Sequence, residues 1–193
     1  NQYSAIACGC GLTKEATSVI ETVLKSDLPL ILDADGLNIV AAKNYLEMIS
    51  TREAETIFTP HLGEFKRLFP TLTATEFLNR LEITQQASQI SKAIILLKGA
   101  RTIITSPQGK TWLIAESTPA LAKGGSGDVL TGLIGGLVAQ IETIAKPLED
   151  IVASGAWLHQ QGGILAAQNR SQLGVDGVSL SEYILQVISS FSM

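Results

Sequence analysis

Short apolar segments that alternate with helical ones constrain the fold of this chain more than any other feature. LPLILD (residues 28–33) and AIILLKG (residues 93–99) are almost continuously apolar, which is typical of strands buried on both faces of a parallel sheet. Two shorter strands are predicted at residues 4–9 and 55–60, the second one stopped by Pro60. These four strands are separated by segments long enough for helical crossovers, which favours parallel pairing.

Helical periodicity fills the intervals between the strands, and a hairpin follows the last of them. Apolar residues spaced by three and four predict helices from about Thr13, over 36–48, 63–69 and 74–92, from the glycine-rich turn to Gln140, and over 147–168 and 179–191. The hairpin covers residues 102–115 and turns at 106–109. This order predicts an α/β fold with a mostly parallel sheet, in one domain that covers residues 1–193.

The composition excludes several classes of protein. Hydrophobic residues make up 46% of the chain and charged residues 17%, which is typical of a globular protein with a sizeable core. The net charge is −4 and the Lys and Arg residues form no basic block, so no nucleic-acid partner is expected. The longest apolar runs fall well short of a bilayer's thickness, so no membrane-spanning segment is predicted.

The cysteines indicate the cellular compartment of the protein, and the first residue indicates whether the chain is truncated. Cys8 and Cys10 are one residue apart, a spacing that rarely forms a disulfide, so both are predicted to be free packing residues in a reducing, cytoplasmic compartment. Asn1 is not a start methionine, and the chain passes almost directly into its first strand. We therefore expect a truncated or processed chain whose upstream part lies elsewhere.

A glycine-rich turn, KGGSGD (residues 123–128), precedes the most apolar helical segment. A helix N-terminus exposes unpaired N–H groups and attracts anions, and glycines let a phosphate approach the backbone. Asp128 has two interpretations: it accepts a proton from a hydroxyl that attacks the phosphate, or it is a first-turn acid that favours the helix dipole. The two interpretations have about equal weight on this motif alone. No P-loop sequence and no complete G-x-G-x-x-G is present.

Five motifs, taken together and in order, carry a resemblance. They are GCGL (9–12), LDADGLN (32–38), TPHLGEFKRL (59–68), LLKGARTII (96–104) and AKGGSGDVLTGLIGGLVAQ (122–140). The chain resembles the ADP/ATP-dependent NAD(P)H-hydrate dehydratases, which belong to the ribokinase-like superfamily. The resemblance implies a three-layer α/β/α sandwich with a mostly parallel central sheet, here apparently without its N-terminal part.

The same resemblance implies an activity. Family members return the S-epimers of NADHX and NADPHX to NADH and NADPH: ADP or ATP phosphorylates the ring hydroxyl, and phosphate then leaves. It also implies Mg²⁺, a homo-oligomer (a tetramer), and either an upstream segment or an epimerase domain outside this chain. Two alternatives stay open: a ribokinase-like kinase acting on a hydroxymethylpyrimidine or thiazole alcohol, and a non-catalytic nucleotide-binding module.

The resemblance also implies roles for individual residues. Asp128 matches the family's base and contacts the hydrate, and the N–H groups of Gly125, Ser126 and Gly127 hold the transferring phosphoryl group. The nucleotide is expected to contact Lys98, Gly99, Ala100, Arg101, Thr102 and Gly127. The substrate is expected to contact Gly9, Gly11, His61, Asp128, Asp35 and Asn38.

Three further points concern single residues. Glu64 either caps the helix that follows it or reaches Mg²⁺, and capping is the favoured role. His159 lies on the apolar face of its predicted helix, so we expect a packed, hydrogen-bonded core histidine. Cys10 and Thr13 replace a proline and a glycine that are usual in the family, and Thr118 replaces an asparagine.

Overall fold

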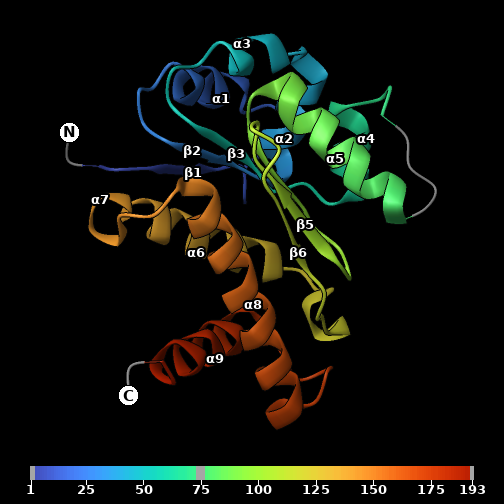
Figure 1. Cartoon of the computed structure of the whole chain (residues 1–193), viewed down its shortest axis with the longest axis vertical. Coiled ribbons are helices and arrows are strands. Elements are labelled where there is room, and N and C mark those ends of the chain that lie inside the picture. The colour runs from blue at the N-terminus through green and yellow to red at the C-terminus, as the bar shows by residue number, and fades with distance from the viewer. Residues whose placement is uncertain (1–2, 73–76, 192–193) are drawn as a thin grey trace.

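A computed structural model of the chain describes residues 3–72 and 77–191 (Figure 1). One six-stranded sheet has the order β1-β2-β3-β4-β5-β6. Its strands are β1 (Ile6–Cys8), β2 (Leu30–Leu32), β3 (Thr56–Phe58), β4 (Ile94–Leu97), β5 (Thr102–Thr105) and β6 (Thr111–Ile114). The first four pair in parallel, and β4–β5 and β5–β6 pair antiparallel. The predicted mostly parallel sheet and its hairpin are therefore confirmed.

Helices cover both faces of the sheet. The described helices are α1 (Thr17–Leu24), α2 (Ala34–Lys43), α3 (Leu46–Ser50), α4 (Leu62–Leu68), α5 (Phe77–Ser91), α6 (Ser126–Val138), α7 (Ile141–Ile144), α8 (Leu148–Arg170) and α9 (Gly177–Ser189), with a short 3-10 helix, η1 (Pro119–Leu121). Leu30 and Leu32 face the core formed with α1–α5, whereas Ile31 faces the core formed with α6 and α8. This alternation produces the three layers of the expected α/β/α sandwich.

Three helix predictions need correction. The single helix predicted over residues 36–48 is wrong, because Asn44 adopts a left-handed conformation (φ 55°) that ends α2 before α3 begins. The helix predicted from about Thr13 begins only at Thr17. The glycine-turn helix ends at Val138 rather than at Gln140. The helix predicted over residues 74–92 begins, in that prediction, at residues 74–76, which lie outside the described residues.

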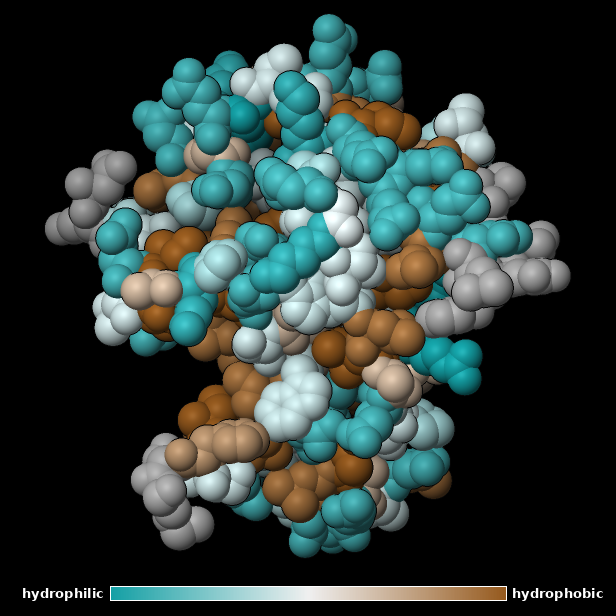
Figure 2. Space-filling model, viewed as in Figure 1, coloured by the Kyte–Doolittle hydropathy of each residue, from teal (hydrophilic) through white to brown (hydrophobic). Residues whose placement is uncertain are grey.

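Helices α8 and α9 extend below the sheet and pack along each other (Figure 1). Their contact forms a third core with η1, built around Ala166, Leu180 and Ile184. In Figure 2 hydrophilic side chains cover most of the upper part, while hydrophobic ones gather around the narrower region below. Val178 and Leu185 of α9 are largely exposed. Within the described residues, no helix combines the length and the apolar character needed to cross a bilayer.

Candidate active site

The carboxyl ends of three parallel strands meet the first turn of α6 at one edge of the sheet. Asp33 follows β2, and His61 follows β3 and forms an isolated parallel bridge with Lys98, which follows β4. Ligands of open α/β sheets bind at this kind of edge. The structure thus brings together residues that are 65 positions apart in the chain.

A half-buried ion pair lies at this edge of the sheet, and Thr131 links it to α6. The Lys98 Nζ atom lies 2.7 Å from the Asp33 Oδ1 atom, and the Thr131 hydroxyl donates to Asp33 Oδ2 at 2.9 Å. Asp33 is 1% exposed, so its charge needs both partners. The pair therefore holds the Lys98 ammonium group at the edge of the sheet and joins α6 to β2.

The glycine turn begins α6 at the same place. Gly125 adopts a left-handed conformation (φ 87°) as the N-cap residue, and α6 starts at Ser126. The position of a Cβ atom on Gly127 would lie 3.4 Å from Asp33 Oδ2 and 3.5 Å from Lys98 Nζ. The positive end of a 13-residue helix and a lysine thus lie beside each other, an arrangement that favours a bound anion.

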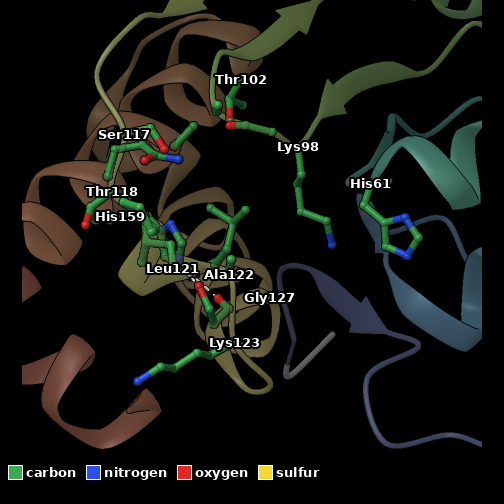
Figure 3. Close-up of a pocket in the computed structure, with 17 residues that line it drawn as sticks. His61, Lys98, Thr102, Ser117, Thr118, Leu121, Ala122, Lys123, Gly127 and His159 are labelled. Atoms are coloured by element: carbon green, nitrogen blue, oxygen red, sulfur yellow. Dashed lines mark hydrogen bonds between the residues drawn. The ribbon is translucent and has the colours of Figure 1, made fainter. Parts of the chain in front are cut away.

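A cavity of ≈ 590 Å³ opens beside this turn (Figure 3). Its lining includes most of the residues predicted to bind the nucleotide, namely Lys98, Gly99, Ala100, Thr102 and Gly127, and also Ser126, which is predicted to hold the transferring phosphoryl group. Arg101 does not line it. Most of the lining surface is apolar, as expected of a site that accepts a flat ring system next to a charged group. In the view of Figure 3 the Lys98 amine lies between His61 and Gly127.

A second, smaller cavity of ≈ 310 Å³ includes Asp128, Gly9, Cys10 and Thr131 in its lining. Asp128 and Gly9, both predicted to contact the substrate, therefore come together, whereas Gly11 does not line the cavity. Consecutive residues of one turn, Gly127 and Asp128, thus line different cavities.

Cys10 occupies the smaller cavity with its thiol next to two carboxylates. Its Sγ atom lies 3.9 Å from Asp33 Oδ2. Burial, the charge of Asp33 and the proximity of Asp128 raise the pKa of Cys10 to about 12. The thiol is therefore neutral at physiological pH.

His61 and Glu64 form a capping box at the start of α4. The His61 ring atom Nδ1 accepts hydrogen bonds from the backbone N–H groups of Gly63 (2.9 Å) and Glu64 (3.3 Å). The backbone N–H of His61 donates to Glu64 Oε2 (2.8 Å). The capping role of Glu64 is therefore present, and its role as a Mg²⁺ ligand stays a prediction. His61 lines the larger cavity, next to Lys98, and its contact with the substrate also stays a prediction.

Asp35 and Asn38 line neither cavity. The Asn38 amide donates to Asp35 Oδ1 (3.0 Å), and Arg67 donates to Asn38 Oδ1 (2.8 Å). The two residues therefore connect the first turn of α2 to α4. This is the turn-and-cap arrangement that their sequence also allows, and their contact with the substrate stays a prediction.

Sequence reasoning missed several residues of the larger cavity. Ser117, Thr118, Leu121 and Lys123 line it from the connection between β6 and α6, and His159 and Gln160 line it from α8. The expected core histidine is present: His159 is buried and its ring contacts Ser126. Helical periodicity predicted the burial of His159, but it carried no information on the turn that the ring contacts.

Comparisons with known proteins agree with this geometry. The chain is 51% identical over 185 residues to the bifunctional NAD(P)H-hydrate repair enzyme Nnr of Synechocystis sp., covering 96% of this chain and 34% of that protein. It is 33% identical over 156 residues to the ADP-dependent (S)-NAD(P)H-hydrate dehydratase of Neisseria meningitidis, covering 80% of this chain and 51% of that protein. The chain thus spans about a third of the first of these relatives and half of the second.

Solved structures give the same answer. The ADP/ATP-dependent NAD(P)H-hydrate dehydratase of Bacillus subtilis, co-crystallised with ATP/Mg²⁺, superposes with a TM-score of 0.81 at 32% identity, covering 98% of this chain and 65% of that one. The expected ribokinase-like fold is therefore confirmed. The family profile described as NAD(P)H-hydrate dehydratase matches residues 1–186. This chain belongs to the NAD(P)H-hydrate dehydratase family.

Proposed function

We propose that this protein repairs hydrated nicotinamide cofactors, returning the S-epimers of NADHX and NADPHX to NADH and NADPH at the expense of ADP or ATP. The observation that carries the proposal is the position of the first turn of α6, where Gly127 lines the larger cavity and Asp128 the smaller one. A phosphoryl donor in the first cavity and an acceptor hydroxyl in the second would meet across this turn. The names of the relatives from Neisseria meningitidis and Bacillus subtilis support ADP and ATP as donors.

The nucleotide occupies the larger cavity in this proposal. Its phosphates lie against the N–H groups at the start of α6 and beside the Lys98 ammonium group, which Asp33 holds in place at 2.7 Å. Phosphoryl transfer depends chiefly on positioning and on stabilising the charge of the transferred group. Gly125, Ser126 and Gly127 are the proposed backbone donors, although the Ser126 N–H also donates to the Lys123 carbonyl oxygen at 3.3 Å. Lys98, Gly99, Ala100 and Thr102 then surround the rest of the nucleotide.

The hydrated nicotinamide ring occupies the smaller cavity, with its hydroxyl at Asp128. A carboxylate is a weak base for an alcohol, so the proton moves late, once bonding to phosphorus has made the hydroxyl acidic. The phosphorylated carbon then loses phosphate. The adjacent ring carbon gives up a proton as its electron pair forms the double bond of the reduced nicotinamide. The net reaction converts ADP to AMP and phosphate, or ATP to ADP and phosphate.

Mg²⁺ fits this site as a companion of the nucleotide rather than as a resident ion. Within residues 3–72 and 77–191, no group of three or more His, Cys, Asp or Glu side chains could hold a metal. Mg²⁺ prefers substrate phosphates, water and one or two carboxylates, so it would enter with the nucleotide. When bound, it neutralises phosphate charge. Glu64 remains a proposed ligand, although its carboxylate already accepts a hydrogen bond from His61.

Several properties of the whole protein belong to the same proposal. Residues 1–193 form one domain, and an upstream segment or an epimerase domain completes the protein, as the bifunctional name of the Synechocystis relative suggests. The protein works in the cytoplasm, which the free thiols of Cys8 and Cys10 support. It assembles as a homo-oligomer, a tetramer by family resemblance, and the exposed Val178 and Leu185 of α9 support burial between subunits.

The test follows the absorbance of the reduced nicotinamide. The protein is mixed with the S-epimer of NADHX and with ADP or ATP, and the absorbance is expected to recover only when a nucleotide is present. If neither nucleotide restores it and a hydroxymethylpyrimidine or thiazole alcohol is phosphorylated instead, the kinase alternative is correct. Nucleotide binding without turnover of either substrate class would indicate a non-catalytic module.

A further inference from the structure

A buried histidine, His159, contacts the glycine turn, and the proposed reaction does not use it. His159 comes from the middle of α8, 33 residues beyond Ser126, and is 4% exposed. Its Nε2 atom lies 2.9 Å from the Ser126 carbonyl oxygen and 3.2 Å from the Ser126 hydroxyl oxygen. Both residues line the larger cavity (Figure 3).

The contact with the Ser126 carbonyl determines the tautomer of the ring. A carbonyl oxygen only accepts hydrogen bonds, so Nε2 must carry the proton at 2.9 Å. Nδ1, which has no hydrogen-bond partner within the described residues, then carries a lone pair and no proton. Burial, and after it the charge of Lys98, lower the pKa of His159 from 6.5 to about 4 against the opposing effect of the Ser126 hydrogen bond, so the ring is neutral at physiological pH.

This tautomer also sets the role of the Ser126 hydroxyl. Because Nε2–H can only donate, the hydroxyl oxygen accepts from it. The hydrogen of the hydroxyl therefore stays available to donate to another group, and Ser126 faces the larger cavity. An anion in that cavity is the acceptor that its chemistry favours.

The Ser126 carbonyl and the Gly127 N–H belong to one peptide group. A hydrogen bond to the carbonyl fixes the plane of this group and polarises its N–H. The first N–H groups of a helix have no intrahelical partner, and Gly124, Gly125 and Gly127 give the surrounding backbone unusual freedom. The Ser126 carbonyl is an intrahelical acceptor as the first carbonyl of α6, and its second lone pair accepts from His159, which adds a restraint on this peptide from outside α6.

We infer that His159 is a positioning residue of the phosphoryl site: its Nε2–H holds the Ser126 carbonyl and hydroxyl so that the Gly127 N–H and the Ser126 O–H face the transferred group. The inference rests on the proposed function. His159 itself does not touch the substrate, and it transfers no proton. Its role is to keep two donors aligned before the nucleotide arrives.

Two substitutions of His159 separate positioning from packing. His159→Gln keeps a neutral N–H donor of similar reach, whereas His159→Leu keeps apolar volume and removes the donor. We expect His159→Leu to lower kcat by about 10- to 100-fold, with a smaller change in the KM for ADP, because it misaligns donors rather than deleting one. His159→Gln should recover most of the lost kcat. Equal values of kcat for the two variants, whether high or low, would overturn the inference.

A double-mutant cycle tests whether the effect of His159 on kcat depends on Ser126. Ser126→Ala should lower kcat in the wild-type background and have a smaller effect in the His159→Leu background, because the two residues act together. Val152→Ala is the matched control for lost stability: Val152 lies on α8, is fully buried and lines neither cavity. It should lower the melting temperature and leave kcat unchanged while the protein is folded. Independent, fully additive effects of Ser126→Ala and His159→Leu would contradict the inference.

The tautomer offers a readout that needs no turnover. In ¹⁵N spectra of the imidazole rings, His159 should show a protonated Nε2 and an unprotonated Nδ1 at neutral pH. The opposite tautomer would refute the role of His159 and leave the proposed function untouched. If the wild-type protein fails to repair NADHX both with ADP and with ATP, the proposed function is refuted instead. The two failures are therefore distinguishable.

Discussion

At the scale of the single residue, two neighbours in the candidate site, Gly127 and Asp128, have different proposed roles. Gly127 lines the larger cavity, where the absence of a side chain leaves room near Lys98, and Asp128 lines the smaller one. A carboxylate beside bound phosphate would normally repel it. Because the two residues line different cavities, the anion site and the base can coexist within one helical turn.

Substitution of Asp128 tests this separation. Asp128→Asn removes the proton acceptor but keeps the size of the side chain, so turnover should fall by about 10²- to 10⁴-fold, the usual contribution of a general base. Affinity for ADP, measured by calorimetry, should change little because Asp128 does not line the larger cavity. Glu142→Gln is the control, since Glu142 is an exposed acid in the first turn of α7 and lines neither cavity. Unchanged turnover in Asp128→Asn would show that the base is another group.

Gly9 gives a residue-scale prediction on stability. Its φ is 126°, and a Cβ atom would lie 1.8 Å from the backbone oxygen of Asp33, where nothing can move without displacing β2. Gly9→Ala should therefore destabilise the protein by about 2–4 kcal/mol in urea unfolding. Gly109→Ala, also at positive φ (88°) but with open space around it, should cost only about 1 kcal/mol. Equal losses for the two variants would contradict the role of the clash.

The sequence predicted the residues of the turn better than their partners. Asp128, Gly127 and Lys98 stand in motifs whose local chemistry suggests an anion site. The contact of His159 with Ser126 and that of Thr131 with Asp33 join residues 33 and 98 positions apart. Such contacts depend on how helices dock on the sheet, which periodicity does not encode. Local chemistry and the family resemblance therefore predicted a site at this turn, and tertiary packing determines which groups hold the turn in place.

At the scale of the element, boundaries were harder to predict than identity. The strands and most helices lie where they were predicted, because continuous apolar runs mark the buried strands and apolar residues spaced by three and four mark the helices. The break between α2 and α3 depends instead on one residue, Asn44, in a conformation that asparagine tolerates but does not require. The late start of α1 at Thr17 likewise reflects turns at residues 14–16 that no apolar spacing announces.

Close packing of α9 on α8 gives a prediction at this scale. A Cβ atom on Gly162 would lie 2.4 Å from Ile184 Cγ1 and 3.0 Å from the Ile184 backbone nitrogen. Gly162→Ala should therefore push α9 from α8 and lower stability by about 1–3 kcal/mol, despite the better helix propensity of alanine. The measurement is urea unfolding followed by circular dichroism.

The control for this prediction is Gly136→Ala on α6. No atom lies within 4 Å of the position of its Cβ, and Gly136 is exposed. Helix propensity then acts alone, so the variant should gain up to about 1 kcal/mol. A gain of the same size in Gly162→Ala would mean that the two helices separate without cost.

At the scale of the whole molecule, the buried ring of His159 connects global stability to pH. Burial first, and then Lys98, lowers its pKa from 6.5 to about 4, although the bond to Ser126 opposes the change. The unfolded chain therefore binds a proton more readily than the folded one between these two values. The stabilisation is fully present above pH 6.5 and is lost as the pH falls toward about 4.

The size of this effect follows from the shift. A change of one pKa unit corresponds to about 1.4 kcal/mol, so acidification from pH 6.5 to 4 should cost about 3 kcal/mol through His159 alone. Carboxylates also change the free energy of unfolding between pH 6.5 and 4. The quantity to measure is therefore the difference in stability to urea between the wild type and His159→Gln as the pH falls. Glutamine does not titrate, so the difference should be largest near neutral pH and shrink toward pH 4. A difference that stays constant between pH 7 and pH 4 would mean that His159 takes up its proton as readily in the folded protein as in the unfolded chain, and the glycine turn would then face a charged ring below pH 6.5 rather than a neutral donor.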